Sequence, residues 1–274
     1  MSGPETTDMV EYGTGPVGHP CHRFGAGSER LVIVPGVMDP LGWNTPSRLT
    51  AELLARYYFR AFREYDVWVV SRPPGLSPGT TARDLGDRYA RVLDAIGSAH
   101  VLGLSLGGMI ATHLAARHPE QVNRLVLVAC GTHLGEHGRH TVRRWRRLAD
   151  GDRWTALHVD YARTVYSGTR AQTVPWLYRL ASRWLPRPLV PADVSLSCDA
   201  MLAYDGTDVL DDIEAPALVV ADSDGTLVPE RLQRDGARRL PDGYVVAFEG
   251  GHAVYEERRR EFGRTVLRFL DGEF

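Results

Sequence analysis

The stretch AHVLGLSLGG, residues 99–108, decides the fold of this chain. An apolar run of strand-forming residues meets a serine, Ser105, with glycines two residues before it and two residues after it. A helical apolar pattern follows at once and closes at His118. This order predicts a strand that turns sharply into a helix, with the serine hydroxyl projecting from the turn. Gly103 and Gly107 are needed because a Cβ there would collide with neighbouring backbone.

The start of the predicted helix places a second chemical feature beside Ser105. Leu106 is the first helical residue, so its N–H has no partner within the helix and lies at the positive end of the helix dipole. A hydroxyl nucleophile next to such an N–H suits attack on a carbonyl, whose oxygen becomes negatively charged. The sequence therefore predicts Ser105 as a nucleophile and the N–H of Leu106 as an oxyanion donor.

Length and composition limit the class of protein. The chain has 274 residues, 43% hydrophobic and 24% charged, which suits one globular α/β domain with room for an insertion. A net charge of −2 argues against a surface built to bind nucleic acid or an anionic membrane. No run approaches the roughly 18 apolar residues of a membrane span, and the first residues do not resemble a signal peptide. Three separated cysteines form no disulfide framework, which favours a cytoplasmic location.

All 32 positively charged side chains are arginine, because the sequence has no lysine. Codon usage in a GC-rich genome accounts for such a bias without any functional cause. The absence of lysine still excludes mechanisms that depend on one, namely Schiff-base chemistry, a P-loop and a lysine base.

Short apolar runs alternate with helical periods along most of the chain. Strand patterns cover residues 31–34, 66–70, 99–104, 124–129, 217–221 and 244–248, and helical periods cover residues 48–62, 81–96, 106–118 and 256–270. Strands that alternate with helices predict an α/β fold, with a mostly parallel sheet covered by helices on both faces.

Residues 132–211 break this alternation, because no convincing strand interrupts their helical segments. About eighty residues is far longer than a crossover loop. We therefore expect a helical cap that roofs the site, inserted into a core formed by residues 1–131 and 212–274. Its aromatic residues are expected in the core of the cap, with substrate contact as the alternative. Its arginines, among them Arg143 and Arg147, are expected on a solvated face.

A serine hydroxyl needs a base, and that base works best when a carboxylate orients it. On a sheet of this kind the chain order is serine, acid, histidine, each just beyond the end of a strand. His252 follows the last strand pattern after a Gly-Gly turn, which predicts it as the base. Asp224 follows the preceding strand pattern and is the predicted acid. Asp222 is its competitor, and Glu136 is a more remote alternative.

These features together resemble the α/β-hydrolase superfamily, above all its small capped members, such as enol-lactone hydrolases, carboxylesterases and cofactor-free haloperoxidase-like enzymes. The likeness spans residues 31–270 and rests on GLSLGGM at 103–109, Gly251 and His252 before the last helix, and IEAP at 213–216 ahead of the acid region. The resemblance implies a triad of Ser105, Asp224 and His252 that works without a cofactor or a metal.

The chain departs from the family pattern at two places. The family usually carries His-Gly after an early strand, where this chain has Pro35 before the glycine. The resemblance then implies that the N–H of Val37 is the second oxyanion donor, since proline has no N–H. The family's acid commonly lies four residues before the proline of a Val-Pro pair, whereas Asp224 lies five before Pro229. This extra residue keeps Asp222 open as the acid.

Two other motifs point to different chemistry. The stretch DSDGTLV at 222–228 spells the first motif of haloacid-dehalogenase-type phosphatases, which use an aspartate nucleophile and magnesium. Too little chain follows it for such a domain, and that remainder holds no lysine. The stretch HLGEH at 133–137, with His140 nearby, spells an inverted zinc-protease motif, which requires a regular helix. Glycines punctuate this stretch, so we expect a histidine-rich loop at the cap entrance instead.

The sequence therefore predicts a serine hydrolase that cleaves a carboxylic ester, lactone or thioester through an acyl-enzyme. Its substrate is expected to be a small molecule with an apolar portion. The same fold and triad also serve C–C bond hydrolysis, lyase and perhydrolase reactions, so these stay open, as does a non-catalytic receptor on this scaffold.

Overall fold

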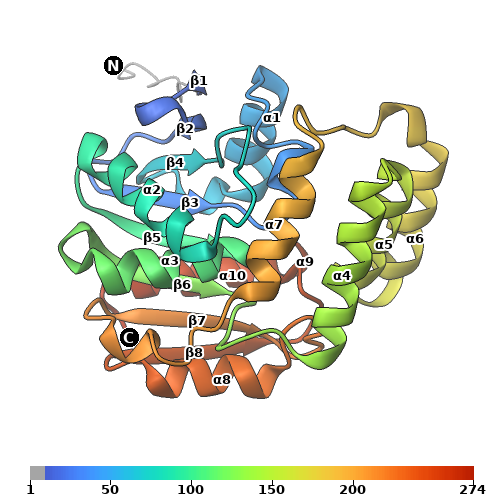
Figure 1. Cartoon of the computed structure of the whole chain (residues 1–274). Coiled ribbons are helices and arrows are strands. Elements are labelled where there is room, and N and C mark those ends of the chain that lie inside the picture. Colours follow the sequence, from blue (N-terminus) through green and yellow to red (C-terminus); the bar gives the residue numbers. More distant parts are fainter. Residues whose placement is uncertain (1–9) are drawn as a thin grey trace.

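The computed structural model describes residues 10–274 and shows a central sheet flanked by helices (Figure 1). The expectation about a signal peptide concerns residues 1–9 and lies outside the described part. The strands of the sheet are β1 (Glu11–Thr14), β2 (Pro20–Phe24), β3 (Arg30–Val34), β4 (Asp66–Val70), β5 (Ala99–Leu104), β6 (Val122–Val128), β7 (Ala217–Asp222) and β8 (Gly243–Phe248). Their spatial order is β1-β2-β4-β3-β5-β6-β7-β8.

The mostly parallel sheet confirms the predicted fold class. Each pairing among the strands β3 to β8 is parallel, whereas β1 and β2 add an antiparallel edge that the sequence patterns did not predict. Leu31 and Ile33 belong to the core on one face of the sheet, and Val32 and Val34 to the core on the other. Because both faces are covered, the strand reads as a continuous apolar run.

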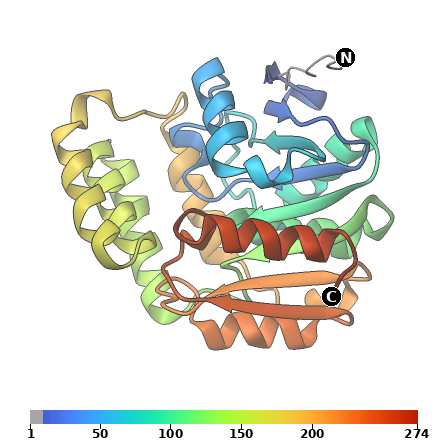
Figure 2. The ribbon, with the colours of Figure 1, turned by 180° about the vertical axis from the view of Figure 1, so that it is seen from behind.

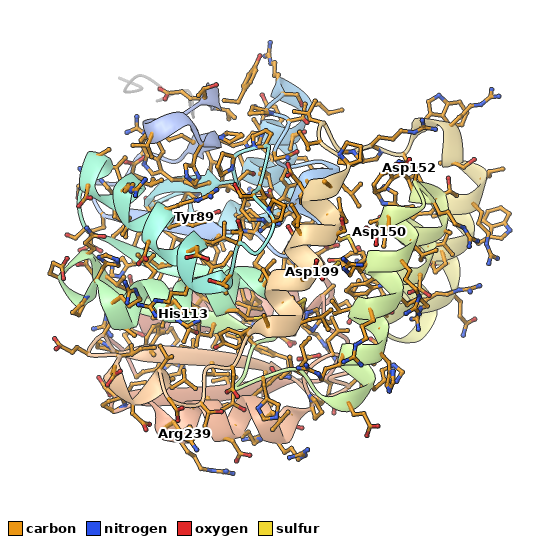
Figure 3. All side chains as sticks on the ribbon, viewed as in Figure 1. Tyr89, His113, Asp150, Asp152, Asp199 and Arg239 are labelled. Carbon is orange, nitrogen blue, oxygen red and sulfur yellow. The ribbon has the colours of Figure 1, made fainter. Side chains whose placement is uncertain are left out.

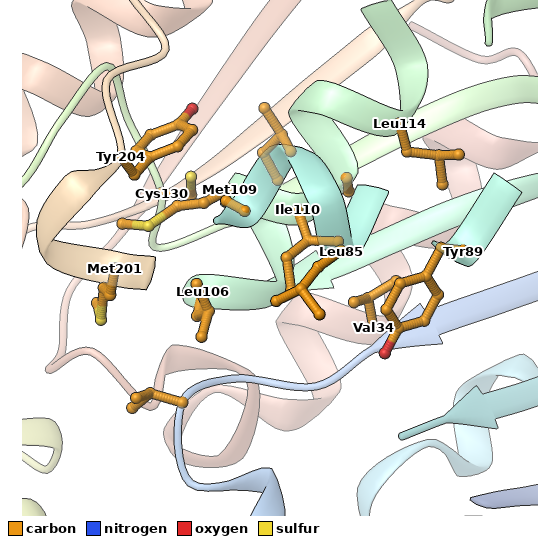
Figure 4. Close-up of a cluster of buried hydrophobic side chains, with 14 of the residues drawn as sticks. Val34, Leu85, Tyr89, Leu106, Met109, Ile110, Leu114, Cys130, Met201 and Tyr204 are labelled. Carbon is orange, nitrogen blue, oxygen red and sulfur yellow. The ribbon is translucent and has the colours of Figure 1, made fainter. Parts of the chain in front are cut away.

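Helices cover both faces of the sheet (Figures 1 and 2). One face carries α2 (Ala82–Ile96), α3 (Leu106–Arg117) and α8 (Glu230–Arg239), and the other carries α1 (Arg48–Leu53) and α10 (Arg259–Leu270), with α9 (Val254–Glu257) just before α10. In the core beneath α2 and α3, Leu85 and Tyr89 lie close to Ile110 and Leu114 (Figure 4). This packing fixes α3, and with it the turn that carries Ser105.

Two predicted helices are interrupted. The period over residues 48–62 becomes α1, a π-helical turn at Leu54–Tyr58 and a 3-10 turn at Arg60–Phe62. A π-helical turn brings residues five apart onto one side, so Leu54 and Phe59 both reach the core. The period over residues 256–270 divides into α9 and α10 at Arg258, whose guanidinium donates to the carbonyl of Glu249 at 2.8 Å.

Four helices separate β6 from β7. They are α4 (Glu136–Asp150), α5 (Trp154–Val165), α6 (Gly168–Leu180) and α7 (Ala192–Ala203), called the helical insertion below. The first three stand beside the sheet, and α7 lies between them and the core (Figure 1). Arg146 of α4 joins the two parts of the insertion, since its guanidinium contacts Asp199 of α7 at 2.6 Å. It also contacts Asp150 of its own helix at 2.8 Å, and Figure 3 labels both aspartates.

The aromatic residues of the helical insertion divide between two environments. Trp145 and Trp154 are buried, as expected for a core, whereas Trp176 and Trp184 are 60% and 74% exposed. Arg143 is exposed, as expected for a solvated face. Among residues 10–274, no helix combines the length and the apolar character that a membrane span requires.

Candidate active site

Ser105 occupies the sharp turn between β5 and α3. Its backbone has φ 54° and ψ −114°, a conformation that residues with a Cβ rarely adopt, and its N–H donates to the carbonyl of Val128 at 2.9 Å. A Cβ at Gly107 would overlap the backbone carbonyl of Val34, and one at Gly103 would overlap the backbone of Gly107 and Gly108. The glycines thus let the strand and the helix meet closely enough to hold Ser105 in this strained position.

The structure brings His252 to Ser105. The Nε2 atom of His252 lies 2.8 Å from the Oγ atom of Ser105, although the two residues are 147 positions apart in sequence. His252 is 5% exposed, and it follows β8 in a loop that closes against the helical insertion. Within that loop the N–H of Ala253 donates to the carbonyl of Val165, at the end of α5, at 2.8 Å.

The structure does not bring Asp224, the acid expected from the sequence, to the histidine. Asp224 is exposed in the turn after β7, and its carboxylate accepts from the hydroxyl of Ser223 at 3.5 Å. The geometry instead favours Asp222, whose Oδ2 atom lies 3.8 Å from Nδ1 of His252. The reason is that β7 runs one residue further than its apolar pattern, so Asp222 is held at the end of the strand. Glu136 begins α4 and is exposed.

A glutamine secures the Asp222 carboxylate. The side-chain N–H of Gln233, on α8, donates to Oδ1 of Asp222 at 2.5 Å, and its oxygen accepts from the N–H of Asp222 at 3.3 Å. Both residues are fully buried. Oδ2 of Asp222 and Nδ1 of His252 are buried and have no hydrogen-bond partner among the described residues. A shift of less than about 1 Å would join these two atoms in a hydrogen bond.

A buried arginine holds the loop after β3 against the site. Arg72 donates to the carbonyls of Pro35, Gly36 and Val37 at 3.1, 2.8 and 3.4 Å. The backbone N–H of Arg72 also donates to Asp39 at 2.9 Å, and its guanidinium lies 3.8 Å from the same carboxylate. Burial raises the pKa of Asp39, and the charge of Arg72 opposes that rise. These contacts hold five residues in one fixed unit: Pro35, Gly36, Val37, Asp39 and Arg72.

This unit sets the direction of one backbone donor. In a trans peptide the C=O and the N–H point in opposite directions, so the N–H of Val37 points away from the arginine that binds the carbonyl of Gly36. Gly36 lies next to the turn that carries Ser105, since a Cβ on Gly36 would lie 3.6 Å from Cβ of Ser105. Val37 and Leu106 are buried. They flank the site as part of the loop after β3 and as the first residue of α3.

A cavity of about 220 Å³, here called the chamber, opens onto Ser105 and His252. Its wall is rich in aromatic residues from the core and the helical insertion: Trp43, Tyr58, Tyr161, Tyr166, Tyr178 and Tyr255. The tyrosines of the insertion therefore line the chamber. This position agrees with the alternative from the sequence, substrate contact, and not with burial in the core of the cap. No arginine belongs to its wall among the described residues.

Glu256 places a buried carboxyl group on the chamber wall. Burial raises the pKa of its carboxyl, while the hydroxyl of Tyr166 donates to that carboxyl at 2.8 Å and opposes the rise. Burial also raises the pKa of Tyr166 itself. No sequence pattern pointed to Glu256, Gln233 or Arg72, because each contacts residues that are distant in the chain.

The two competing motifs of the sequence do not form their sites. Helix α4 begins at Glu136, so His137 and His140 lie in a helix and not in the loop expected from the glycines. His133 precedes the helix and does not share a helical face with His137. Within residues 10–274 no group of three or more His, Cys, Asp or Glu side chains is placed to hold a metal ion. Asp222 is turned toward His252 and Gln233, in the arrangement described above.

Comparison with known proteins places this geometry in a family. The model of a family described as "Alpha/beta hydrolase family" matches residues 31–265. A "Putative carbamate hydrolase RutD" of Caulobacter vibrioides is 30% identical over 213 residues, 72% of this chain and 75% of that protein. A pimeloyl-[acyl-carrier protein] methyl ester esterase of Neisseria meningitidis is 30% identical over 192 residues, 68% of this chain and 73% of that protein.

A similar solved structure agrees with the fold. The enol-lactonase from Burkholderia xenovorans LB400 superposes with a TM-score of 0.75 at 18% identity, covering 95% of this chain and 100% of that one. The matched relatives are named as hydrolases, which supports a hydrolase enzyme here. With the family model matching from β3 into α10, the chain belongs to the alpha/beta hydrolase family.

Proposed function

We propose that this protein is a serine hydrolase that cleaves carboxylic esters, lactones or thioesters through an acyl-enzyme. The observation that carries the proposal is the contact of 2.8 Å between Nε2 of His252 and Oγ of Ser105, two residues that line the chamber. A hydroxyl within hydrogen-bond reach of an imidazole is the arrangement that general-base activation requires. The positive φ of Ser105 adds support, since such strain is maintained where the hydroxyl must be presented.

In the proposed mechanism, Oγ of Ser105 attacks the substrate carbonyl while Nε2 of His252 accepts the hydroxyl proton. The N–H groups of Val37 and Leu106 stabilise the negative charge that develops on the carbonyl oxygen. His252 passes its proton to the leaving group, and the acyl-enzyme forms. A water molecule, activated by His252, then attacks the acyl carbon and releases the acid and free Ser105.

Asp222 is the proposed orienting acid, in place of Asp224. Its carboxylate faces Nδ1 of His252, and a bond between them fixes the tautomer that leaves Nε2 free to accept a proton. Gln233 supports the role because it occupies one carboxylate oxygen and leaves the other directed at the imidazole.

The helical insertion is proposed to act as a cap, over residues 132–211, that selects the substrate. Five of its residues line the chamber together with Ser105 and His252 of the core: His158, Tyr161, Tyr166, Tyr178 and Pro186. Such aromatic walls suit an apolar or aromatic group on the substrate. The matched relatives are named as a carbamate hydrolase and a methyl ester esterase, and both of these reactions are hydrolyses at a carbonyl carbon.

Labelling with a fluorophosphonate probe tests the nucleophile. Wild type is expected to take up one equivalent at Ser105, whereas Ser105→Ala takes up none and His252→Ala is labelled far more slowly. Peptide mapping by mass spectrometry identifies the modified residue. Labelling that persists at another serine in Ser105→Ala, or its absence from wild type, contradicts the proposal.

Paired amide variants test the acid. Asp222→Asn is expected to lower kcat for ester hydrolysis by a factor on the order of 10³–10⁴, because the imidazole loses its orienting charge and its tautomer. Asp224→Asn, which removes an exposed charge two residues away, is the matched control and is expected to stay near the wild-type rate. The reverse pattern restores Asp224 as the acid.

A further inference from the structure

A groove of about 730 Å³, here called the arginine groove, lies where the segment after α1 packs against α10. Six arginines line it: Arg56, Arg60, Arg63, Arg259, Arg260 and Arg264. No acidic residue belongs to its wall among the described residues. The whole chain carries a net charge of −2, so this concentration of positive charge is local and does not reflect a basic protein.

Four of these six arginines lack an acidic partner among the described residues. Arg56 pairs with Glu52 at 2.7 Å and Arg63 with Glu64 at 3.2 Å. Within residues 10–274, Arg60, Arg259, Arg260 and Arg264 make no ion pair, and all of them except Arg259 are exposed. Like charges held this close repel one another, so a multivalent anion between them is stabilised.

Arg259 supplies a more ordered feature. Its guanidinium carbon lies 3.9 Å from the centre of the Tyr57 ring, and its Nη1 atom is buried without a hydrogen-bond partner among the described residues. A guanidinium held on an aromatic face is already positioned, so it loses little side-chain entropy when it binds an anion. Arginine also donates two parallel hydrogen bonds to phosphate, whereas a lysine ammonium acts only as a point charge.

The arginine groove borders the chamber. Tyr58 belongs to the wall of both, so the two cavities lie on either side of one residue. A smaller hollow shares Glu256 with the chamber, and Tyr57, Arg259 and Arg260 with the groove. An anionic group in the groove is therefore adjacent to the site that carries Ser105, whereas the chamber wall itself offers no arginine.

We propose that the arginine groove binds the phosphate groups of an acyl donor whose carbonyl carbon is presented to Ser105. Four guanidinium groups without an acidic partner among the described residues are balanced by several negative charges, which favours a nucleotide carrying more than one phosphate over a single phosphate. The inference rests on the proposed function, and among the ester, lactone and thioester substrates considered there it selects acyl thioesters of a phosphorylated nucleotide carrier. The reaction is the same hydrolysis: water cleaves the thioester to a carboxylic acid and a thiol.

Binding of adenosine 3′,5′-bisphosphate tests the groove without any reference to catalysis. Isothermal titration calorimetry at low salt is expected to show binding to wild type that weakens as salt is added. Arg260→Gln/Arg264→Gln, two exposed positions four residues apart on α10, is expected to weaken binding by about tenfold or more, since a charge-assisted hydrogen bond contributes about that factor. Arg143→Gln/Arg147→Gln, also exposed and four apart but on α4, is the matched control and keeps the wild-type affinity.

A matched pair of thioesters tests the link to Ser105. Butyryl-coenzyme A and S-butyryl-N-acetylcysteamine have the same acyl group and thioester, but only the first carries phosphates. We expect kcat/KM to be about tenfold or more higher for the coenzyme A ester in wild type, and this preference to vanish in Arg260→Gln/Arg264→Gln while hydrolysis of the truncated ester is unchanged.

The outcomes separate the two proposals. Equal kcat/KM for both thioesters, absence of bisphosphate binding, or an equal loss in the α4 control overturns the role of the groove and leaves the hydrolase proposal standing. Failure of Ser105 to react with fluorophosphonate overturns the hydrolase proposal. In that case a titration in which only the α10 variant loses affinity still identifies the groove as a phosphate site.

Discussion

His22, in β2 between the strands β1 and β4, is a buried histidine whose ring has no hydrogen-bond partner among the described residues. It is fully buried. Burial lowers its pKa from 6.5 to about 4, because the charged ring cannot be solvated there. The folded protein therefore holds this ring neutral at pH values where the unfolded chain already binds a proton.

Replacing His22 with leucine is expected to make the protein less sensitive to acid. In wild type the unfolded chain binds a proton below pH 6.5 and the folded chain only near pH 4, so stability is complete above 6.5 and falls between these values. The free energy of unfolding of wild type should fall by about 3 kcal/mol more than that of His22→Leu over this range. Urea titrations at pH 7, 5.5 and 4.5 measure the difference; parallel curves for the two proteins contradict it.

The acid shows how far residue chemistry can be predicted from sequence. The GLSLGG motif at 103–108 predicted Ser105, and the Gly-Gly turn predicted His252, because each motif carries its own local geometry, and the two side chains lie 2.8 Å apart. Asp222 and Asp224 differ by two positions in one short segment, and no local pattern separates them. Their environments differ because of Gln233, which reaches Asp222 from the next helix. Such a tertiary partner is not visible in a strand pattern.

At the scale of elements, the loop after β3 depends on the loop after β4. Arg72, in the loop after β4, donates hydrogen bonds to three successive carbonyls of the loop after β3 and contacts Asp39. The strands β3 and β4 were predictable, since each contains a continuous apolar run between turn residues. The position of Arg72 was not, because its contacts depend on β3 and β4 being neighbours in the sheet, which follows from topology and not from either strand alone.

Arg72→Lys is expected to preserve the charge beside Asp39 but lose the shape that holds the loop. A lysine ammonium cannot bind three separated carbonyls in the way a planar guanidinium does. If the N–H of Val37 is thereby displaced, kcat should fall by about 10²–10³, the usual effect of losing one oxyanion donor, with a smaller change in KM. Ester kinetics alongside a thermal melt measure it. A variant that melts lower yet keeps its kcat shows that Arg72 acts only on stability.

At the scale of the whole molecule, one glutamate links the histidine loop to the helical insertion. The carboxylate of Glu257 accepts from the N–H of Gly251 at 2.7 Å and from the N–H of Ser167, between α5 and α6, also at 2.7 Å. The hydroxyl of Thr226, in the loop after β7, donates to the carbonyl of Thr164 at 3.0 Å. The insertion is thus fastened to the loops that follow both late strands.

Glu257→Gln is expected to loosen this link without removing any group that touches substrate. The amide keeps the shape of the carboxylate but offers one oxygen in place of two, so the variant should lose about 1–3 kcal/mol of stability. The rate of fluorophosphonate labelling at Ser105 should fall by about tenfold or more, because His252 follows Gly251 directly and moves with it. Glu261→Gln, an exposed position on α10, is the control. Equal labelling rates for both variants argue against a positioning role.

The placement of Asp222 at the end of β7 has a consequence for redesign. A group anchored by sheet hydrogen bonds and by Gln233 keeps its position when the connection beyond it changes. The exposed residues Ser223 and Asp224 can therefore be exchanged without moving Asp222, whereas Val228 must be kept because its carbonyl accepts from the same Gln233 side chain. In a hydrolase whose orienting carboxylate lies on the connection itself, the same exchange would move that carboxylate away from its histidine.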